Sequence, residues 1–268
     1  MNYGRLASIA FGCLMSVAAA AETAEQKGLS IAMLADGADA GWRSYRAKGE
    51  MILRDAAGKE SARALESLNL ERDAKVEGDW LLILFNSPLD IKGIVSLTHS
   101  KLEPQNDDQW IFLPVDKRVK RISSSNRAGK FVSSEFSFED LSSQEVANYT
   151  YKWLRDEPCP GNPALECHVI DTVPRNARSG YSHRIVWIDS EAYRQWQIQF
   201  LNRRGDLEKT LNATEFNKYN GRHWRPSKIA MVNAQTGKST ILKFAGYDFA
   251  AKLADSDFNP DRMSSLSD

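Results

Sequence analysis

The sequence predicts a mainly β protein with helices (α+β), built as one strongly curved antiparallel sheet of about ten or eleven strands that wraps around its helices. Short runs of alternating or continuous apolar residues, bounded by Gly, Asp, Asn or Pro, recur along most of the chain and are typical of strands. Asn220-Gly221 separates two such runs, and this dipeptide favours a hairpin because both positions of a type I′ turn need positive φ. No period of 20 to 50 residues repeats, which argues against a propeller or solenoid. A curved sheet with helices over its opening has an interior.

Residues 1–21 have the order of a secretory signal peptide. A single charge at Arg5 precedes an apolar run from Leu6 to Val17, and small residues follow up to a predicted cleavage site before Glu22. The apolar run is shorter than the roughly 20 residues that a membrane-spanning helix needs. We therefore expect export to the periplasm and a mature chain of residues 22–268.

The elements follow in order from the mature N-terminus. Leu29, Met33, Leu34 and Ala38 stand at helical spacing and predict a short amphipathic helix between residues 22 and 42. Strand-like runs are expected at residues 44–55, 62–73, 79–88, 91–100, 108–115 and 117–123. Residues 138–156 carry acidic residues early and basic ones late, which favours one or two short helices. A Pro- and Gly-rich loop is expected at 156–167, and an antiparallel meander at 183–249.

The charge balance argues against nucleic acid as a partner. The chain has 35 basic and 35 acidic residues, and the leader removes only one basic residue, Arg5. The basic run Lys117, Arg118, Lys120 and Arg121 is interpreted as the exposed rim of a hairpin. The alternative is a docking site for an acidic partner or for anionic lipid headgroups.

Cys159 and Cys167 are the two cysteines left after removal of the leader, and an oxidising compartment favours a disulfide between them. Their C-x7-C spacing matches no common zinc site, and the four histidines form no metal-binding motif, so no metal or cofactor is expected. The chain has no G-x-S-x-G elbow, S-x-x-K motif or P-loop, and we expect a protein that is not an enzyme.

Aromatic residues suggest where a ligand would lie. Trp196, Ile198 and Phe200 share one face of a strand whose reverse is rich in glutamine, so these three side chains are predicted to line the interior. Trp110, Phe112 and Trp187 are added to the predicted lining, although their strands are apolar on both faces. An ordinary packed core would give the same pattern.

The stretch from Ile111 to Leu141, with "DQW" before it and "NSPLDIKGIVSL" upstream, resembles the outer membrane lipoprotein-sorting proteins, relatives of the LolA and LolB carriers. "LADSDFNPDRMSSL" near the C-terminus resembles the closing segment of that family. One departure is Ser133, where relatives often have Gly, and Glu135 replaces an Asp. The matching positions are Leu113, Pro114, Arg118, Arg121, Ser124, Phe136, Glu139 and Asp140.

The resemblance implies that residues 22–268 form a LolA-like incomplete antiparallel β-barrel with helices as a lid over a hydrophobic cavity. It implies a periplasmic carrier of lipid or lipoprotein acyl chains, with an inner-membrane transporter and an outer-membrane acceptor as possible partners. Physical reasoning agrees, since each methylene removed from water is worth about 0.8 kcal/mol and a lipid needs an apolar container to cross an aqueous compartment. The alternative is a non-enzymatic accessory subunit that docks to an inner-membrane exporter.

Overall fold

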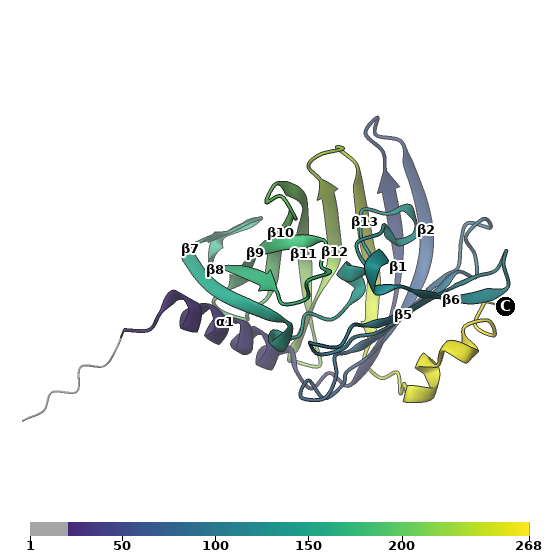
Figure 1. Ribbon diagram of the computed structural model, residues 1–268, viewed down its shortest axis with the longest axis horizontal. Helices are drawn as coiled ribbons and strands as arrows, with labels where there is room; N and C mark the ends of the chain where they lie inside the picture. Colours follow the sequence, from purple (N-terminus) through teal and green to yellow (C-terminus); the bar gives the residue numbers. More distant parts are fainter. Residues whose placement is uncertain (1–20, 268) are drawn as a thin grey trace, which may run out of the picture.

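The computed structural model describes residues 21–267, so the predicted signal peptide lies outside the described residues apart from its last position. Thirteen strands form one sheet, in which every pair of neighbours is antiparallel (Figure 1). Their order is β6-β5-β4-β3-β2-β1-β13-β12-β11-β10-β9-β8-β7. The strands are β1 (Ser44–Arg54), β2 (Glu60–Leu70), β3 (Trp80–Phe85), β4 (Val95–His99), β5 (Asp108–Leu113), β6 (Arg118–Ile122), β7 (Tyr149–Cys159), β8 (Asn162–Pro174), β9 (Tyr181–Asp189), β10 (Gln195–Asn202), β11 (Leu207–Tyr219), β12 (His223–Asn233) and β13 (Ser239–Asp248).

The predicted open, curved antiparallel sheet is confirmed, but the count of ten or eleven strands is too low. The two strands that were missed are β7 and β8, which occupy part of the predicted helical region and the predicted Pro-rich loop. The loop is in fact a tight hairpin turn, with Cys159 paired to Asn162 and Gly161 at φ +79°. Pro158 is tolerated because β7 is an edge strand, where a missing N–H need not break a ladder bond.

The predicted N-terminal helix is confirmed as α1 (Ala24–Asp39), which begins with a capping box formed by Thr23 and Gln26. The predicted apolar face is wrong, because Leu29, Met33 and Leu34 are exposed. The buried side is instead made of small residues and one isoleucine: Gly28, Ile31 and Ala32. Within residues 21–267 no helix is both long and apolar enough to cross a membrane.

The connection between β6 and β7 is dictated by the topology. These strands are consecutive in the chain but form the two opposite edges of the sheet, so residues 123–148, here called the bridging segment, must pass from one edge to the other. The one or two short helices predicted at residues 138–156 are present only as two 3-10 turns, and the second half of that region is strand β7. The bridging segment has only single 3-10 turns: η1 (Ser124–Asn126), η2 (Phe131–Ser133), η3 (Glu139–Leu141) and η4 (Val146–Asn148).

Side-chain hydrogen bonds show that the sheet curls and brings its two halves together. Asn148, which precedes β7, donates to the carbonyl of Lys101 and accepts from the N–H of Glu103, beyond β4. Asn176, which follows β8, donates to the Glu103 carboxylate over 2.6 Å. The result is the incomplete barrel seen in Figure 1, with α1 along the end that carries β7 and β8.

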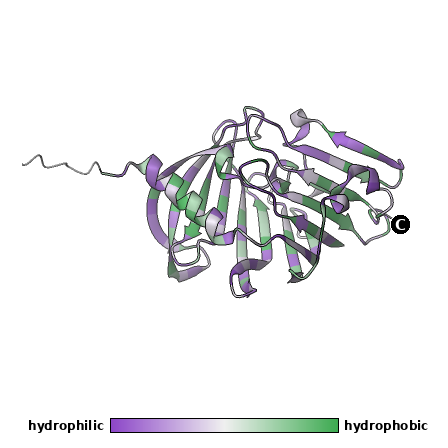
Figure 2. Ribbon diagram, turned by 90° about the horizontal axis from the view of Figure 1, so that it is seen from below, coloured by the Kyte–Doolittle hydropathy of each residue, from purple (hydrophilic) through white to green (hydrophobic). Residues whose placement is uncertain are grey.

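Apolar residues pack in three clusters. The main core lies on the side of the sheet that α1 covers, and it includes Ile31 of α1 together with Phe85 and Phe131. The outer cluster lies on the other side of β2–β5, where the C-terminal turns η5 (Asp255–Phe258) and η6 (Pro260–Arg262) cover it with Phe258 and Met263. The third, called the disulfide cluster, surrounds Cys159 and Cys167. Alternating colours along the strands in Figure 2 reflect this division into two faces.

Candidate binding surface

A continuous apolar row runs across the α1 side of the sheet. Residues that pair directly across antiparallel strands share a face, so the row can be followed from strand to strand. Its members lie on β8 to β12 and pair in sequence: Ile170, Val186, Ile198, Leu211 and Met231. Four of these five are buried, whereas Leu211 is half-buried.

A second row lies beside the first and is less covered. Ala213 on β11 pairs with Ile229, Ile229 pairs with Leu242 on β13, and Leu242 pairs with Met51 on β1. Ile229, Leu242 and the nearby Phe244 pack against the main core but are only half-buried. The middle of the sheet thus presents half-buried apolar side chains on the α1 side.

A polar row borders these apolar rows and fixes the bridging segment. Arg184 pairs with Phe200, Phe200 with Lys209, and Lys209 with Asn233, and all four are buried. The Lys209 ammonium donates to the Asp140 carboxylate over 2.6 Å and to the carbonyl of Glu135 over 3.1 Å.

Further bonds attach the same segment to the sheet. Asn233 donates to the Glu135 carboxylate over 2.9 Å, and Tyr181 donates to Asp140 over 2.8 Å. Burial, together with the Asp140 carboxylate, raises the pKa of the Tyr181 phenol well above its usual range, so this group stays a donor. Buried charges are tolerated here because Lys209 is paired with Asp140 and Glu135 with Lys130. The Arg184 guanidinium donates to the side chains of Thr172 and Gln144 instead.

The phenyl rings of Phe131 and Phe136 enter the main core from the bridging segment. Between them Val132 and Ser133 adopt positive φ, 44° and 60°. Glycine is the residue that takes such angles without cost, and a non-glycine residue held there costs on the order of 1–3 kcal/mol. The bonds of the polar row supply the surrounding structure that keeps this turn in place.

The structure distributes the six predicted lining residues over all three clusters. Ile198 and Phe200 lie in the main core. Trp187 and Trp196 lie in the disulfide cluster, and Phe112, with Trp110 packed beside it, lies in the outer cluster beneath the C-terminal turns. The six therefore do not form one surface.

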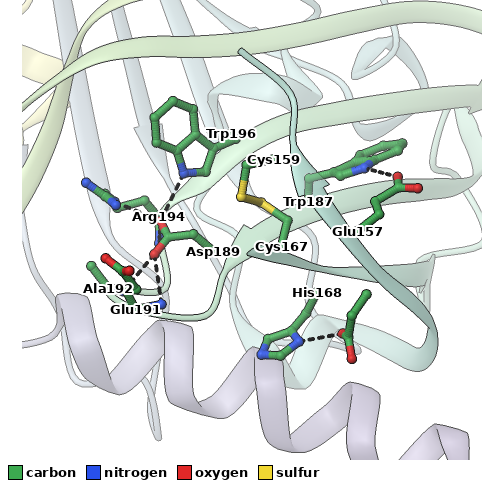
Figure 3. Close-up of a disulfide and its surroundings, with 11 residues drawn as sticks. Glu157, Cys159, Cys167, His168, Trp187, Asp189, Glu191, Ala192, Arg194 and Trp196 are labelled. Carbon is green, nitrogen blue, oxygen red and sulfur yellow. Dashed lines mark hydrogen bonds and ion pairs between the residues drawn. A yellow bond between two sulfur atoms is a disulfide. The ribbon is translucent and has the colours of Figure 1, made fainter. Parts of the chain in front are cut away.

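Trp196 leaves the face of Ile198 because the ladder is irregular at that point. The register between β9 and β10 shifts between Gln195 and Gln197, so Trp196 lies at a bulge. Its indole donates to Asp189 over 2.9 Å, and Trp187 donates to Glu157 over 2.6 Å (Figure 3).

The predicted disulfide is present between Cys159 and Cys167, which close the β7–β8 hairpin. Figure 3 shows Trp196 and Trp187 on either side of it. Both tryptophans therefore pack around a covalent cross-link rather than on the α1 side of the sheet.

The basic run forms an exposed edge, as predicted. Lys117 lies in the turn before β6, and Arg118, Lys120 and Arg121 lie on β6, where four of the five residues are exposed. Lys120 pairs with Asp116 and Arg121 pairs with Asp108.

The histidines have structural partners. His168 bonds to Asp156 and His183 to Asp171, while His99 stacks on Trp80 with 3.9 Å between ring centroids. Burial lowers the pKa of the His99 imidazole. In the described part of the chain, no three His, Cys, Asp or Glu side chains come together as metal ligands would.

Comparison with known proteins identifies the family. A domain from Vibrio parahaemolyticus that is named for outer membrane lipoprotein sorting is 39% identical, with a TM-score of 0.85, over 90% of this chain and 99% of that one. The chain belongs to this lipoprotein-sorting family. A family model described as "-like: Uncharacterized protein" matches residues 77–265. No curated protein matches the sequence.

Two more distant structures share the fold of this chain. A DUF1329 family protein from Desulfovibrio piger is 22% identical with a TM-score of 0.83, and a LolA superfamily protein from Nitrosomonas europaea is 19% identical with a TM-score of 0.68. Each comparison covers 90% of this chain and 99% of the other. The predicted LolA-like fold is thereby confirmed.

The half-buried residues of β11–β13 were missed at the sequence level. Leu211 lies between the polar Thr210 and Asn212, a signal that was available but was read only as part of a meander. Ile229 and Leu242 each have an apolar neighbour, so strand period alone does not assign them to one face. Lys209 gave no signal of its own, because a lysine between Glu208 and Thr210 is typical of an exposed strand.

Proposed function

We propose that this protein is a periplasmic, non-enzymatic carrier that binds lipid or lipoprotein acyl chains for outer membrane lipoprotein sorting or lipid transport. Membership of the lipoprotein-sorting family supports the class of cargo. The charged Arg5, apolar run and small residues of the N-terminus support export and cleavage of a signal peptide.

The observation that carries the proposal is the pair of apolar rows on the α1 side of the sheet. Leu211, Ile229, Leu242 and Phe244 are half-buried there beside the fully packed Ile198 and Phe200. An acyl chain bound along these side chains would be removed from water, which is favourable by about 0.8 kcal/mol for each buried methylene. α1 would cover the chain from one side and the bridging segment from the other.

Of the six predicted lining residues, only Ile198 and Phe200 remain proposed contacts of the acyl chain. The other four have structural roles in this proposal. Trp187 and Trp196 would support the hairpin that carries α1, and Trp110 and Phe112 would hold the C-terminal turns. An inner-membrane transporter as donor and an outer-membrane acceptor remain proposed partners.

The test is a fluorescent fatty-acid binding assay on Ile229→Asp, with Val232→Asp as the matched control. Both substitutions put a charge on β12, but Ile229 faces the main core side, whereas Val232 is 42% exposed at a position of opposite parity. A charge in an apolar site is strongly disfavoured, so Ile229→Asp is expected to weaken binding by at least about tenfold.

Circular dichroism establishes that both variants are folded before binding is compared. Equal binding by folded Ile229→Asp and wild type would contradict the proposed surface. Failure of the wild type to bind any acyl probe would favour the accessory subunit that docks to an exporter.

A further inference from the structure

Two aliphatic side chains project from neighbouring turns at one end of the sheet. Leu89, in the connection between β3 and β4, is 90% exposed, and Val115, in the turn between β5 and β6, is 92% exposed. Both line one depression of about 340 Å³, whose floor includes Ile94, Leu113 and Pro114. Single exposed aliphatic residues are ordinary, but two at the rim of one apolar depression form a patch.

Internal hydrogen bonds close both turns. The N–H groups of Ile91 and Lys92 donate to the carbonyl of Pro88, and the N–H of Lys117 donates to that of Pro114. The N–H groups of Leu89, Asp90 and Val115 at the tips have no partner among the hydrogen bonds of the described residues, so these tips suit the hydrated headgroup region rather than the hydrocarbon interior.

Basic residues lie beside this patch. Lys92 lies in the same connection as Leu89, Lys117 follows Val115 in its turn, and Arg118, Lys120 and Arg121 continue along the edge strand β6. The acidic side chains nearby are Asp90, Asp116 and Asp108, and the last two are paired with Lys120 and Arg121. The balance of charge is positive.

We propose that this end of the molecule docks on an anionic lipid bilayer, with Leu89 and Val115 inserted between headgroups and the basic edge against the phosphates. Exposed aliphatic tips beside a row of lysine and arginine fit an interface that is apolar below and negatively charged above. The inference deepens the proposed carrier function by assigning the end from which cargo would be exchanged with a membrane. Vesicle binding nevertheless needs no cargo and can be measured separately.

The experiment is co-sedimentation of the mature chain with vesicles of phosphatidylglycerol and phosphatidylethanolamine, compared with vesicles of phosphatidylcholine alone. The wild type is expected to bind the anionic vesicles and to bind less in high salt. Leu89→Ser/Val115→Ser is expected to weaken binding by about tenfold or more, because it removes the insertion of both aliphatic side chains. Lys117→Ala/Arg118→Ala is expected to weaken it by roughly thirtyfold, since two basic residues at about 1 kcal/mol each contribute about 2 kcal/mol.

Val76→Ser is the matched control. Val76 is 72% exposed in the turn between β2 and β3, at the other end of β3 from Leu89, and its replacement should leave vesicle binding unchanged. Wild-type protein that stays in the supernatant with anionic vesicles would overturn the proposal and favour an acidic protein as the partner of the edge. Equal binding by Leu89→Ser/Val115→Ser and wild type would also overturn it.

The acyl probe separates this inference from the carrier function. Leu89→Ser/Val115→Ser should bind the fluorescent fatty acid as the wild type does, because Leu89 and Val115 lie outside the two apolar rows. Loss of vesicle binding with retained probe binding supports docking. A wild type that binds vesicles but no probe would sink the carrier function alone.

Discussion

Gly28→Ala is expected to destabilise the protein although alanine is the better helix former. Gly28 lies on the buried side of α1, against the backbone of edge strand β7. A Cβ at this position would stand 2.7 Å from the backbone nitrogen of Trp153 and 2.8 Å from the carbonyl carbon of Lys152. These are main-chain atoms of a paired strand, so the helix itself would have to move.

The magnitude follows from two opposing effects. Alanine in place of glycine favours a helix by about 0.8–1.0 kcal/mol. Overpacking of a tight interface costs about 1–3 kcal/mol, and here it would also loosen the contact of Lys27 with Trp153 and Asp156. We expect a net loss of up to about 2 kcal/mol in the free energy of unfolding.

Gly37→Ala is the matched control in the same helix. A Cβ at Gly37 would have no atom within 4 Å, so only the helix propensity changes, and stability should rise by about 0.5–1 kcal/mol. Thermal and urea unfolding of both variants, followed by circular dichroism, measures the difference. If Gly28→Ala stabilises the protein as much as Gly37→Ala does, α1 is not docked on β7 in the way described.

Three further predictions concern the cross-link, a titrating carboxyl and the buried ion pair. Replacing both Cys159 and Cys167 with serine should lower the free energy of unfolding by about 2–3 kcal/mol, because the unfolded chain regains the conformational entropy of a short closed loop. Unfolding of the wild type with and without reductant should show the same difference. Burial raises the pKa of Asp79 to about 7. The nearby carboxylates of Glu145 and Glu71 act in the same direction, whereas a hydrogen bond from the Arg72 N–H opposes the shift. The folded state then holds a proton between about pH 4 and pH 7 that the unfolded state releases, so stability should fall over that window, by at most about 4 kcal/mol, and Asp79→Asn should flatten the profile. Lys209→Met should cost about 3–5 kcal/mol because it leaves Asp140 buried without its cation, and Asp140→Asn in the same chain should recover part of the loss in a denaturant titration; no recovery would mean that the pair does not hold the bridging segment.

The sequence predicted the sheet, its openness and the disulfide because each rests on local signals. Strand-period runs and Asn220-Gly221 define most of the strands. The expected export to an oxidising compartment favoured a bond between Cys159 and Cys167. β7 was missed although Tyr149, Tyr151 and Trp153 alternate with exposed residues at strand period. The acidic-then-basic order of residues 138–156 was interpreted as the charge pattern of short helices instead.

The face of α1 and the position of Trp196 could not be predicted for a different reason. Helical spacing of large apolar residues predicted that Leu29 and Met33 face the sheet. The helix instead contacts the backbone of β7 at Gly28, where there is no room for a side chain. Trp196 was assigned by counting in twos, and a single bulge beyond Gln195 invalidates the count. Both errors depend on tertiary contacts that no local pattern encodes.

The strand order has a consequence for how the chain reaches its native state. Every neighbouring pair in the sheet is consecutive in the chain except β1 and β13, which join at its centre and are separated by the whole of the sequence between Arg54 and Ser239. Each half, β1–β6 and β7–β13, can form from short hairpins. The pairing of β1 with β13 at the centre of the sheet can form only when the last strand is available. Pairings so distant in sequence are slow to form because loop-closure entropy is lost before any contact rewards it. A chain emerging N-terminus first from a membrane pore would therefore expose the β1 edge until β13 arrives, and factors that shield strand edges would act at that stage.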